Sequence, residues 1–269
     1  MIKLAWRVSW IVGNTKNLLD KGANMEKSYT YVMSDIHGEY DAFVKMLDKI
    51  KFNDKDKLYV IGDVLDRGPK PIKTLIHIMN SNNITMLAGN HEHMAILCLR
   101  VLIEDLTDEV FAKISDKFIE SLEDWKMNGG GTTIKDLFDY SKEDRKKVLN
   151  FLMKLKLYKE LTVEDKKYIL AHAGLGNFNK NKKLKEYNIM ELVWDRMDYE
   201  KVYFEDKYLV VGHTPTQLIA SNKKPGYIYI NHNNIVIDCG CTFNDGRLGC
   251  LRLDDMKEYY VMKGDGNAF

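Results

Sequence analysis

Residues 58–68, with the sequence LYVIGDVLDRG, carry the strongest indication of the fold. This stretch opens with four apolar residues that include β-branched and aromatic side chains, and the run is too short for a helix, so it predicts a buried strand. Gly62 ends the run, and Asp63 then stands at the carboxyl end of the strand, where open α/β sheets bind their ligands. Asp66 and Arg67 follow on the same loop. Charged groups crowded together are unfavourable unless each has a partner, so we expect partners for them elsewhere in the chain.

The same order of a short apolar run, a small residue and a polar side chain returns at four further places. The predicted strands lie at residues 29–33, 84–88, 167–171 and 208–211. The polar residues that follow them, in order, are Asp35 with His37, Asn90 with His91, His172, and His213. Because the pattern repeats, we expect these side chains to gather at one edge of the fold.

Helices are predicted between the early strands. Apolar residues recur with helical spacing over residues 40–50 and 71–80. Later strands follow one another closely, through 235–237 to a last one at 248–253. We therefore predict an α/β fold in which two mixed β-sheets pack face to face as a central sandwich flanked by helices, with four layers in the order αββα.

Residues 94–158 form a long segment with helical character and no strand signal. Asn128 and the three glycines after it interrupt this segment. The interruption fits either a flexible connection or a loop whose backbone amides approach an anion. We predict a single domain over residues 28–269, with a helical insert at about 94–158.

Residues 1–27 differ from the rest of the chain. Their apolar residues are interrupted by Lys3 and Arg7, so the run falls far below the ~20 residues that span a membrane. No small-residue cleavage site follows, so a signal peptide is not expected. We interpret these residues as an N-terminal extension of unknown role, with a weak surface anchor as an alternative. No stable membrane association is expected.

The composition limits the class of partner. The chain has 269 residues, 45% of them hydrophobic, which is enough for one large α/β domain or two small ones. Lys+Arg 40 against Asp+Glu 39 gives a net charge of +1, so there is no general basic field and we expect no nucleic-acid partner. The four cysteines, Cys98, Cys239, Cys241 and Cys250, lack CxxC spacing. They are expected to be buried thiols, which fits a reducing cytoplasm.

The polar residues at the strand ends suggest metal binding. Asp35 and His37 lie two apart, so in extended backbone they would point to the same side and could hold one ion. Taken alone, they fit an N-cap aspartate beside a surface histidine better than a metal site. Together with Asp63, Asn90, His172 and His213, they form a suitable set for two divalent ions about 3.5–4 Å apart.

At these residues the chain resembles the phosphoprotein phosphatase family of serine/threonine phosphatases, within the calcineurin-like metallophosphoesterase superfamily, in its bacterial and bacteriophage branch. The motifs that carry the resemblance are DIHG (35–38), GDVLDRG (62–68), GNHE (89–92), HAG (172–174) and GHTP (212–215). All five occur in order, and the resemblance covers about residues 28 to 253.

The resemblance implies a role for each matching residue. Asp35 and His37 would bind the first metal, Asp63 would bridge both, and Asn90, His172 and His213 would bind the second. His91, paired with Asp66, would protonate the leaving oxygen. Arg67 and Arg196 would hold the phosphate oxygens, and Asn90 would also contact the substrate. Arg196 rests on the short match VWDR (193–196).

The chemistry of such a site is hydrolysis of a phosphate ester. Two cations make a bridging hydroxide available near pH 7, which attacks phosphorus in line with the leaving group. Cations and arginines neutralise the phosphate oxygens, and a histidine supplies the proton that an alkoxide needs. Mixed nitrogen and oxygen ligands favour Mn²⁺, with Fe, Zn and Mg as alternatives.

The predicted function is a metal-dependent phosphomonoesterase of the serine/threonine protein phosphatase type, which acts on a phosphorylated protein, peptide or small phosphate ester. One alternative is a symmetrical dinucleoside-tetraphosphate hydrolase or another nucleotide or small-molecule phosphoesterase. That branch typically lacks the second aspartate of GDxxDRG and carries Asp after GNH, whereas this chain has Asp66 and Glu92. A second alternative is a binding protein without turnover, which would be expected to have lost some ligands.

Overall fold

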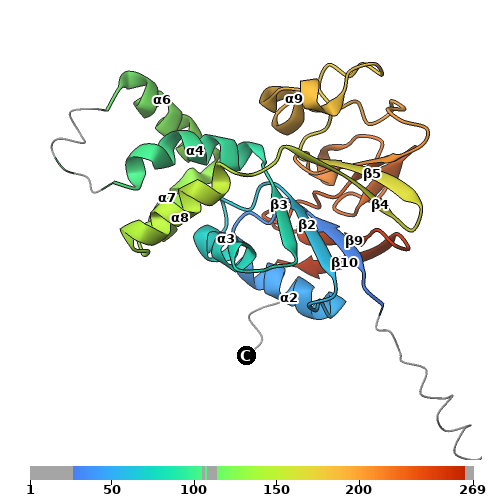
Figure 1. Cartoon of the computed structure of the whole chain (residues 1–269), viewed down its shortest axis with the longest axis horizontal. Helices are drawn as coiled ribbons and strands as arrows, with labels where there is room; N and C mark the ends of the chain where they lie inside the picture. The colour runs from blue at the N-terminus through green and yellow to red at the C-terminus, as the bar shows by residue number, and fades with distance from the viewer. Residues whose placement is uncertain (1–26, 105–106, 108–113, 264–269) are drawn as a thin grey trace, which may run out of the picture.

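The computed structural model describes residues 27–104, 107 and 114–263. Apart from Lys27, the N-terminal extension predicted at residues 1–27 lies outside the described residues. Within the described part, the strands form two mixed sheets of five strands each (Figure 1). The predicted pair of sheets flanked by helices is thereby confirmed.

Sheet A has the strand order β10-β9-β1-β2-β3. Its strands are β1 (Thr30–Met33), β2 (Lys57–Ile61), β3 (Ile84–Leu87), β9 (Arg247–Arg252) and β10 (Lys257–Met262). Strands β1, β2 and β3 are parallel because helices α2 (Tyr40–Ile50) and α3 (Pro71–Met79) make the crossovers between them. The carboxyl ends of these three strands therefore meet at one edge of the sheet.

Sheet B has the order β4-β5-β6-β8-β7. Its strands are β4 (Tyr158–Val163), β5 (Lys166–Ala171), β6 (Tyr208–Val211), β7 (Tyr229–Asn231) and β8 (Asn234–Val236). Strands β5, β6 and β8 run parallel, so the residues that follow β5 and β6 also lie at a common edge.

The helices divide between the two outer faces. Helices α4 (Asn90–Leu102), α6 (Asp116–Trp125), α7 (Gly131–Leu137) and α8 (Lys142–Leu152) lie between β3 and β4 in the chain. A kinked helical turn, η1 (Lys126–Gly130), joins α6 to α7. Figure 1 shows this group gathered beside β3, away from sheet B. Sheet B carries the short helix α9 (Ile189–Val193) and the 3₁₀ turns η2 (Leu184–Glu186) and η3 (Thr216–Leu218).

Apolar side chains alternate along the strands and so build the layers. In β1, Val32 packs between the two sheets, while Tyr31 and Met33 face the helices. In β6, Val210 packs between the sheets, while Leu209 and Val211 face α9. Each such side chain contributes about 1.5–3 kcal/mol when fully buried. Two-sided burial therefore fixes both sheets and the direction in which their carboxyl ends point.

The structure differs from the predicted elements at three places. Strand β4 (Tyr158–Val163) was not predicted, because it is a polar edge strand that ends the segment expected to be helical. Strand β7 is three residues long and also forms an edge. The strand predicted as the last, at 248–253, is followed by β10. An edge strand has a neighbouring strand on one side only. Its alternation of apolar and polar residues is therefore weaker and harder to recognise in the sequence.

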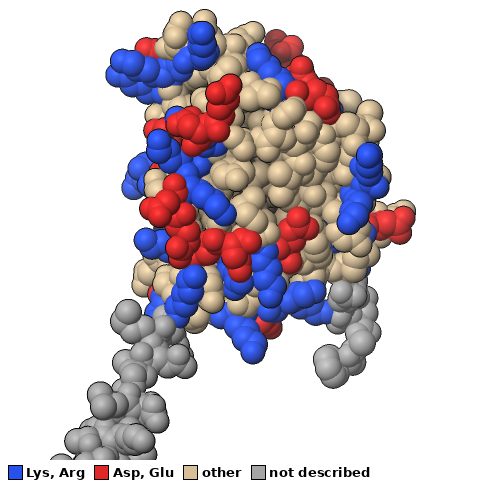
Figure 2. All heavy atoms as spheres, turned by 90° about the vertical axis from the view of Figure 1, so that its right-hand side faces the viewer, with Lys and Arg blue, Asp and Glu red and all other residues tan. Residues whose placement is uncertain are grey.

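The described surface carries charge of both signs. Figure 2 shows Lys, Arg, Asp and Glu side chains mixed around a broad uncharged area on one face. None of the helices formed by residues 27–104, 107 and 114–263 combines the length and the apolar character that a membrane span requires.

Candidate active site

The predicted site residues lie on the turns that follow the parallel strands, and many of these turns have unusual backbone geometry. A left-handed φ angle occurs at Asp35 (51°), His37 (47°), Asp63 (54°), Asp66 (71°), Arg67 (64°) and His213 (65°). The expectation that Asp35 and His37 share a side through extended backbone is therefore wrong, although both turn into the same site. Each such residue stores of order 1–3 kcal/mol of strain, and strain of this kind clusters at functional sites.

Two glycines allow the turns to approach one another. A Cβ on Gly62 would lie 2.6 Å from His172 Nδ1, and the φ of Gly62 is 87°. A Cβ on Gly212 would lie 2.2 Å from Asp35 Oδ2. Any side chain at either position would displace a predicted metal ligand.

Two predicted histidine ligands are held by carbonyl oxygens, one at the end of β2 and one on the loop that follows it. The Nδ1 atom of His37 lies 2.9 Å from the Leu65 oxygen, and Nδ1 of His172 lies 2.8 Å from the Ile61 oxygen. A carbonyl only accepts, so Nδ1 carries the proton in each ring. The Nε2 atom of each ring is then the one directed into the site, as in metal-binding histidines.

His213 is anchored the opposite way round. Its Nε2 atom lies 3.1 Å from the Trp194 oxygen and therefore donates to it. Its Nδ1 atom then faces Asn90 Oδ1 at 2.9 Å, and that oxygen also lies 2.9 Å from Nε2 of His172. A ring nitrogen lone pair that faces an amide oxygen needs a cation or a proton between them. This part of the donor set fits a metal ion.

Asp63 belongs to two groups of possible metal ligands. Its side chain and those of His37 and His91 form one group, and its side chain and those of His172 and His213 form the other. The Oδ2 atom lies 3.7 Å from His37 Nε2, while Oδ1 lies 3.3 Å from His172 Nε2. Each oxygen of one carboxylate thus faces a different group, which fits the bridging position predicted for Asp63.

Asp35 lies beside the first group of possible ligands, next to His37. Its carboxylate oxygens accept the backbone N–H of His213 at 3.2 and 3.1 Å, and Oδ1 lies 4.0 Å from His37 Nε2.

Another buried carboxylate near the site, that of Asp238, was missed by sequence reasoning. Burial and the charge of Asp35 raise its pKa well above the usual value. Its position two residues after the end of β8, before Cys239 and Gly240, is the signal that could have identified it.

The field of these carboxylates attracts positive charge. Burial raises the pKa of Asp35 to about 7, and the charge of Asp63 adds to this effect. Burial by itself lowers the pKa of His172, yet Asp63 and Asp35 outweigh it and raise the pKa to about 10. In the chain without metal, a proton on His172 partly balances the negative charge of these carboxylates. A divalent cation would replace that proton. The residues present therefore fit two metal ions.

Asp66 and His91 form a fully buried pair. The Nδ1 atom of His91 lies 2.6 Å from Asp66 Oδ2. Trp125 Nε1 donates to the same oxygen at 2.8 Å, and the Thr133 hydroxyl donates to Oδ1 at 2.5 Å. Hydrogen bonds from three donors fix the position of the carboxylate. Trp125 and Thr133 were not assigned a role from the sequence.

The glycine-containing interruption after Asn128 is part of this support. It forms the kinked turn η1 and the start of α7, rather than a flexible connection. The Gly129 oxygen accepts the backbone N–H of Arg67 at 3.1 Å, and a Cβ on Gly129 would lie 2.7 Å from Arg67 Cγ. The segment thus packs directly against the loop that carries the predicted phosphate-binding arginine.

Arg67 reaches the centre of the site. Its guanidinium donates to Nε2 of His37 at 2.9 Å and to Nε2 of His91 at 3.0 Å. The guanidinium is planar and its donors are fixed relative to one another, which matches the oxygens of a phosphate. It can turn as one unit from the two rings toward an incoming phosphate. Arg196, in contrast, is exposed. Its charge contributes to lowering the pKa of His213, after the larger effects of burial and of His172.

Glu92 does more than favour the positive end of a helix. It is fully buried, and its Oε2 atom accepts the backbone N–H groups of Asp63 at 2.8 Å and Gly89 at 2.9 Å. Its Oε1 atom accepts those of Val64 at 2.9 Å and Leu65 at 3.2 Å. One carboxylate thus fixes the turn after β2 to the start of α4. The capping spacing from Gly89 to Glu92 was the signal in the sequence.

Two five-stranded sheets with a carboxylate shared between two histidine groups define a metal-dependent hydrolase of the metallophosphoesterase class. The family model described as calcineurin-like phosphoesterase matches residues 29–245, and the chain belongs to that family. Phosphatase relatives agree with this assignment, so the protein is a phosphoesterase.

The curated relatives include two kinds of enzyme. A bis(5'-nucleosyl)-tetraphosphatase PrpE [asymmetrical] from Anoxybacillus flavithermus is 26% identical over 86% of this chain and 92% of its own. Serine/threonine-protein phosphatase 2 from Escherichia coli is 28% identical over 84% of this chain and 93% of its own. A symmetrical bis(5'-nucleosyl)-tetraphosphatase from Salmonella paratyphi C is 30% identical over 54% of this chain and 43% of its own.

Solved structures share the fold. One, provisionally described as a diadenosine tetraphosphatase, has a TM-score of 0.60 at 16% identity, over 90% of this chain and 96% of that one. A serine/threonine phosphatase from Saccharomyces cerevisiae has a TM-score of 0.51 at 15% identity, over 89% and 80%. At these identities the likeness concerns the fold.

Proposed function

We propose that the protein is a phosphomonoesterase of the serine/threonine protein phosphatase type, whose substrate is a phosphorylated protein or peptide. The observation that carries the proposal is the position of Asp63, whose two oxygens face two separate histidine groups. We assign the first ion to Asp35, His37 and Asp63. The second is assigned to Asp63, Asn90, His172 and His213, and Mn²⁺ is the expected occupant of both sites.

When bound, two such ions provide a hydroxide near neutral pH and neutralise negative charge on the phosphate. The residues of this chain then place the substrate and move the proton. Arg67 turns its guanidinium from His37 and His91 to the phosphate oxygens, and Arg196 approaches from the exposed segment that follows α9. Two planar cations on one phosphate suit the charge that spreads over its oxygens during transfer. The amide of Asn90 contacts the phosphate from the start of α4.

His91 donates the proton to the leaving oxygen from Nε2. Its Nδ1 atom stays on Asp66, which orients the ring and favours the protonated form. Burial lowers the pKa of His91, but the charges of Asp63 and Asp66 outweigh burial and raise the pKa above its usual value. The ring is therefore a suitable acid near neutral pH.

A second candidate is hydrolysis of a dinucleoside tetraphosphate. Two of the relatives named above support it, because both carry that activity in their names. Against it stands the buried Asp66–His91 pair. A phosphate leaving group needs no proton at neutral pH, whereas the alkoxide of serine or threonine does.

The experiment that separates the two is a direct comparison of kcat/KM for a phosphoserine peptide, an aryl phosphate and a dinucleoside tetraphosphate, each with Mn²⁺, Mg²⁺ and Zn²⁺. Preference for the phosphopeptide supports the first proposal. Preference for the dinucleotide by tenfold or more, which corresponds to about 1.4 kcal/mol in the transition state, would replace it with the second.

We place the enzyme in the cytoplasm. All four cysteines are buried free thiols. Unpaired cysteines are typical of proteins in a reducing compartment.

A further inference from the structure

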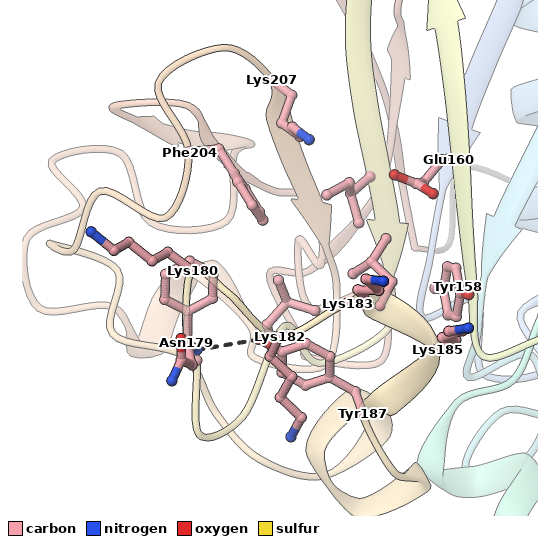
Figure 3. A pocket seen from close by; sticks show the side chains of 14 residues that line it. Tyr158, Glu160, Asn179, Lys180, Lys182, Lys183, Lys185, Tyr187, Phe204 and Lys207 are labelled. Carbon is pink, nitrogen blue, oxygen red and sulfur yellow. Dashed lines mark hydrogen bonds between the residues drawn. The ribbon is translucent and has the colours of Figure 1, made fainter.

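Two neighbouring hollows lie on the face of sheet B that carries α9. One has a volume of about 390 Å³ and the other about 660 Å³. They share four lining residues, and we call the combined surface the lysine groove. The shared residues are Tyr158, Glu160, Lys185 and Tyr187. Figure 3 shows the larger set of side chains around the first hollow.

Seven lysines line the groove, although the whole chain has a net charge of only +1. They are Lys156, Lys159, Lys180, Lys182, Lys183, Lys185 and Lys207. Glu160 is the one carboxylate among the lining residues. A concentration of one sign of charge in a concave surface raises the local concentration of oppositely charged partners.

Much of this charge is available to a partner. Lys182 is paired with Glu191 at 2.6 Å. Lys180, Lys183 and Lys185 are exposed, and none of the ion pairs found among residues 27–104, 107 and 114–263 includes them. Figure 3 shows their ammonium groups arranged around the hollow rather than gathered at one point. An extended partner with several negative charges can contact more of these ammonium groups than a single compact anion can.

The floor of the groove is apolar. Ile169 and Leu175 are buried beneath the first hollow, and Leu192 lines the second. A ligand that uses both features needs aliphatic side chains as well as negative charge. An acidic peptide segment with interspersed aliphatic residues has that chemistry.

Three aromatic rings that line the first hollow, those of Phe178, Tyr187 and Phe204, already have ring or ammonium partners. Phe178 meets Tyr203 and Phe204 edge to face, with ring centroids 4.9 and 5.5 Å apart. The ammonium of Lys182 lies 4.1 Å from the centre of the Tyr187 ring, and that of Lys207 lies over Phe204. Single-stranded nucleic acid binds mainly by stacking on free aromatic faces, so a peptide fits this groove better.

Helix α9 links the groove to the proposed active site. Leu192, on the groove side, accepts the backbone N–H of Ala173 at 2.9 Å, directly after His172. Trp194, two residues further along at the end of the helix, holds His213 through its carbonyl. Leu175 lies three residues after His172, which is at most about 11 Å of chain. One polypeptide can therefore occupy both places.

We propose that the lysine groove binds an acidic, aliphatic segment of the protein substrate, next to the phosphorylated residue that the active site takes. This inference rests on the proposed phosphatase function for its kinetic consequence, but binding itself can be measured independently. The groove would hold the substrate chain and leave the chemical step to the site described above.

The test uses the full chain and a matched pair of charge variants. The groove variant is Lys183→Glu/Lys185→Glu. The control is Lys223→Glu/Lys224→Glu, two exposed lysines that do not line the groove, with the same change in net charge. The probes are a labelled, unphosphorylated peptide of alternating glutamate and leucine, the same peptide with serine in place of leucine, and a single-stranded oligonucleotide.

We expect the glutamate–leucine peptide to bind the wild type most tightly. The groove variant should weaken this binding about tenfold, which corresponds to about 1.4 kcal/mol, and the control should leave it within about twofold. With a phosphopeptide that carries the acidic segment, the groove variant should raise KM by a similar factor while kcat and aryl phosphate hydrolysis stay unchanged.

Three results would overturn the inference: equal peptide binding by the groove and control variants, equal binding of the leucine and serine peptides, or tighter binding of the oligonucleotide through the same lysines. If no phosphopeptide is hydrolysed but the peptide still binds through Lys183 and Lys185, the proposed function fails and the groove remains a peptide site.

Discussion

The carboxylate of Asp66 and the imidazole of His91 meet at 2.6 Å in a place where both side chains are fully buried. Trp125 and Thr133, from the helical insert, complete the hydrogen bonds of the carboxylate. An ionised group in such surroundings is stable only when it is fully paired, so this contact ties the insert to the proposed chemistry.

Replacing His91 should separate proton donation from metal binding. We expect His91→Asn to lower kcat for a phosphoserine peptide by roughly 10²–10⁴-fold, because the leaving alkoxide loses its proton donor. Metal analysis of the purified variant should still find both ions. A variant that loses metal but keeps its rate per bound ion would identify His91 as a ligand instead, since its ring also belongs to the first ligand group.

Replacing Asp66 should move the pH profile. The charge of Asp66 helps raise the pKa of His91, against the opposing effect of burial. His91 must be protonated to act as an acid, so activity is lost as pH rises through that pKa. Asp66→Asn should therefore shift the alkaline limb of kcat to lower pH. An unchanged limb would mean that another group titrates there.

The bridging position of Asp63 predicts coupled metal loss. Asp63→Asn should weaken both ions together, because each oxygen faces a different group of histidines. Metal content and residual activity measured across a titration with Mn²⁺ would show this. The matched control is Asp56→Asn, which alters a buried carboxylate that accepts the backbone N–H groups of Tyr29 and Asn53 instead. Loss of a single ion in the Asp63 variant contradicts the bridge.

A single methyl group should disturb the site at Gly212. The added Cβ of Gly212→Ala would lie 2.2 Å from Asp35 Oδ2, so the carboxylate must move. We expect a fall in metal affinity of roughly 10–100-fold. Gly131→Ala is the control, because nothing lies within 4 Å of its Cβ and the residue is in helix α7. That change should leave metal binding intact and stabilise the fold by up to about 1 kcal/mol.

Metal binding should release protons in a pH-dependent amount. The pKa of His172 is about 10 and that of Asp35 about 7 in the metal-free chain. At pH 7 bound ions displace the proton of His172 and about half a proton from Asp35, whereas at pH 9 Asp35 is already ionised. Affinity should therefore rise with pH, while proton release falls. Calorimetry in two buffers of different ionisation enthalpy measures both, and equal proton release at pH 7 and pH 9 would exclude this account.

Most of the strands and helices, in their order, and the residues that carry the predicted chemistry could be found from the sequence alone. Strand ends could be located because a buried strand needs a continuous apolar run, and Gly62 and Gly212 stop two of those runs. The family could be identified because its motifs are local in sequence. These features depend on neighbouring residues only, so a pattern along the chain suffices to show them.

The contacts that hold the site in place became visible only in the folded chain. Trp125 and Thr133 reach Asp66 across 59 and 67 residues, and no local pattern marks such contacts. The four backbone N–H groups that Glu92 accepts, and the lysine groove beside α9, likewise arise from segments that meet only after folding. A side chain's partner depends on the packing of distant segments, whereas its type and spacing are fixed along the chain.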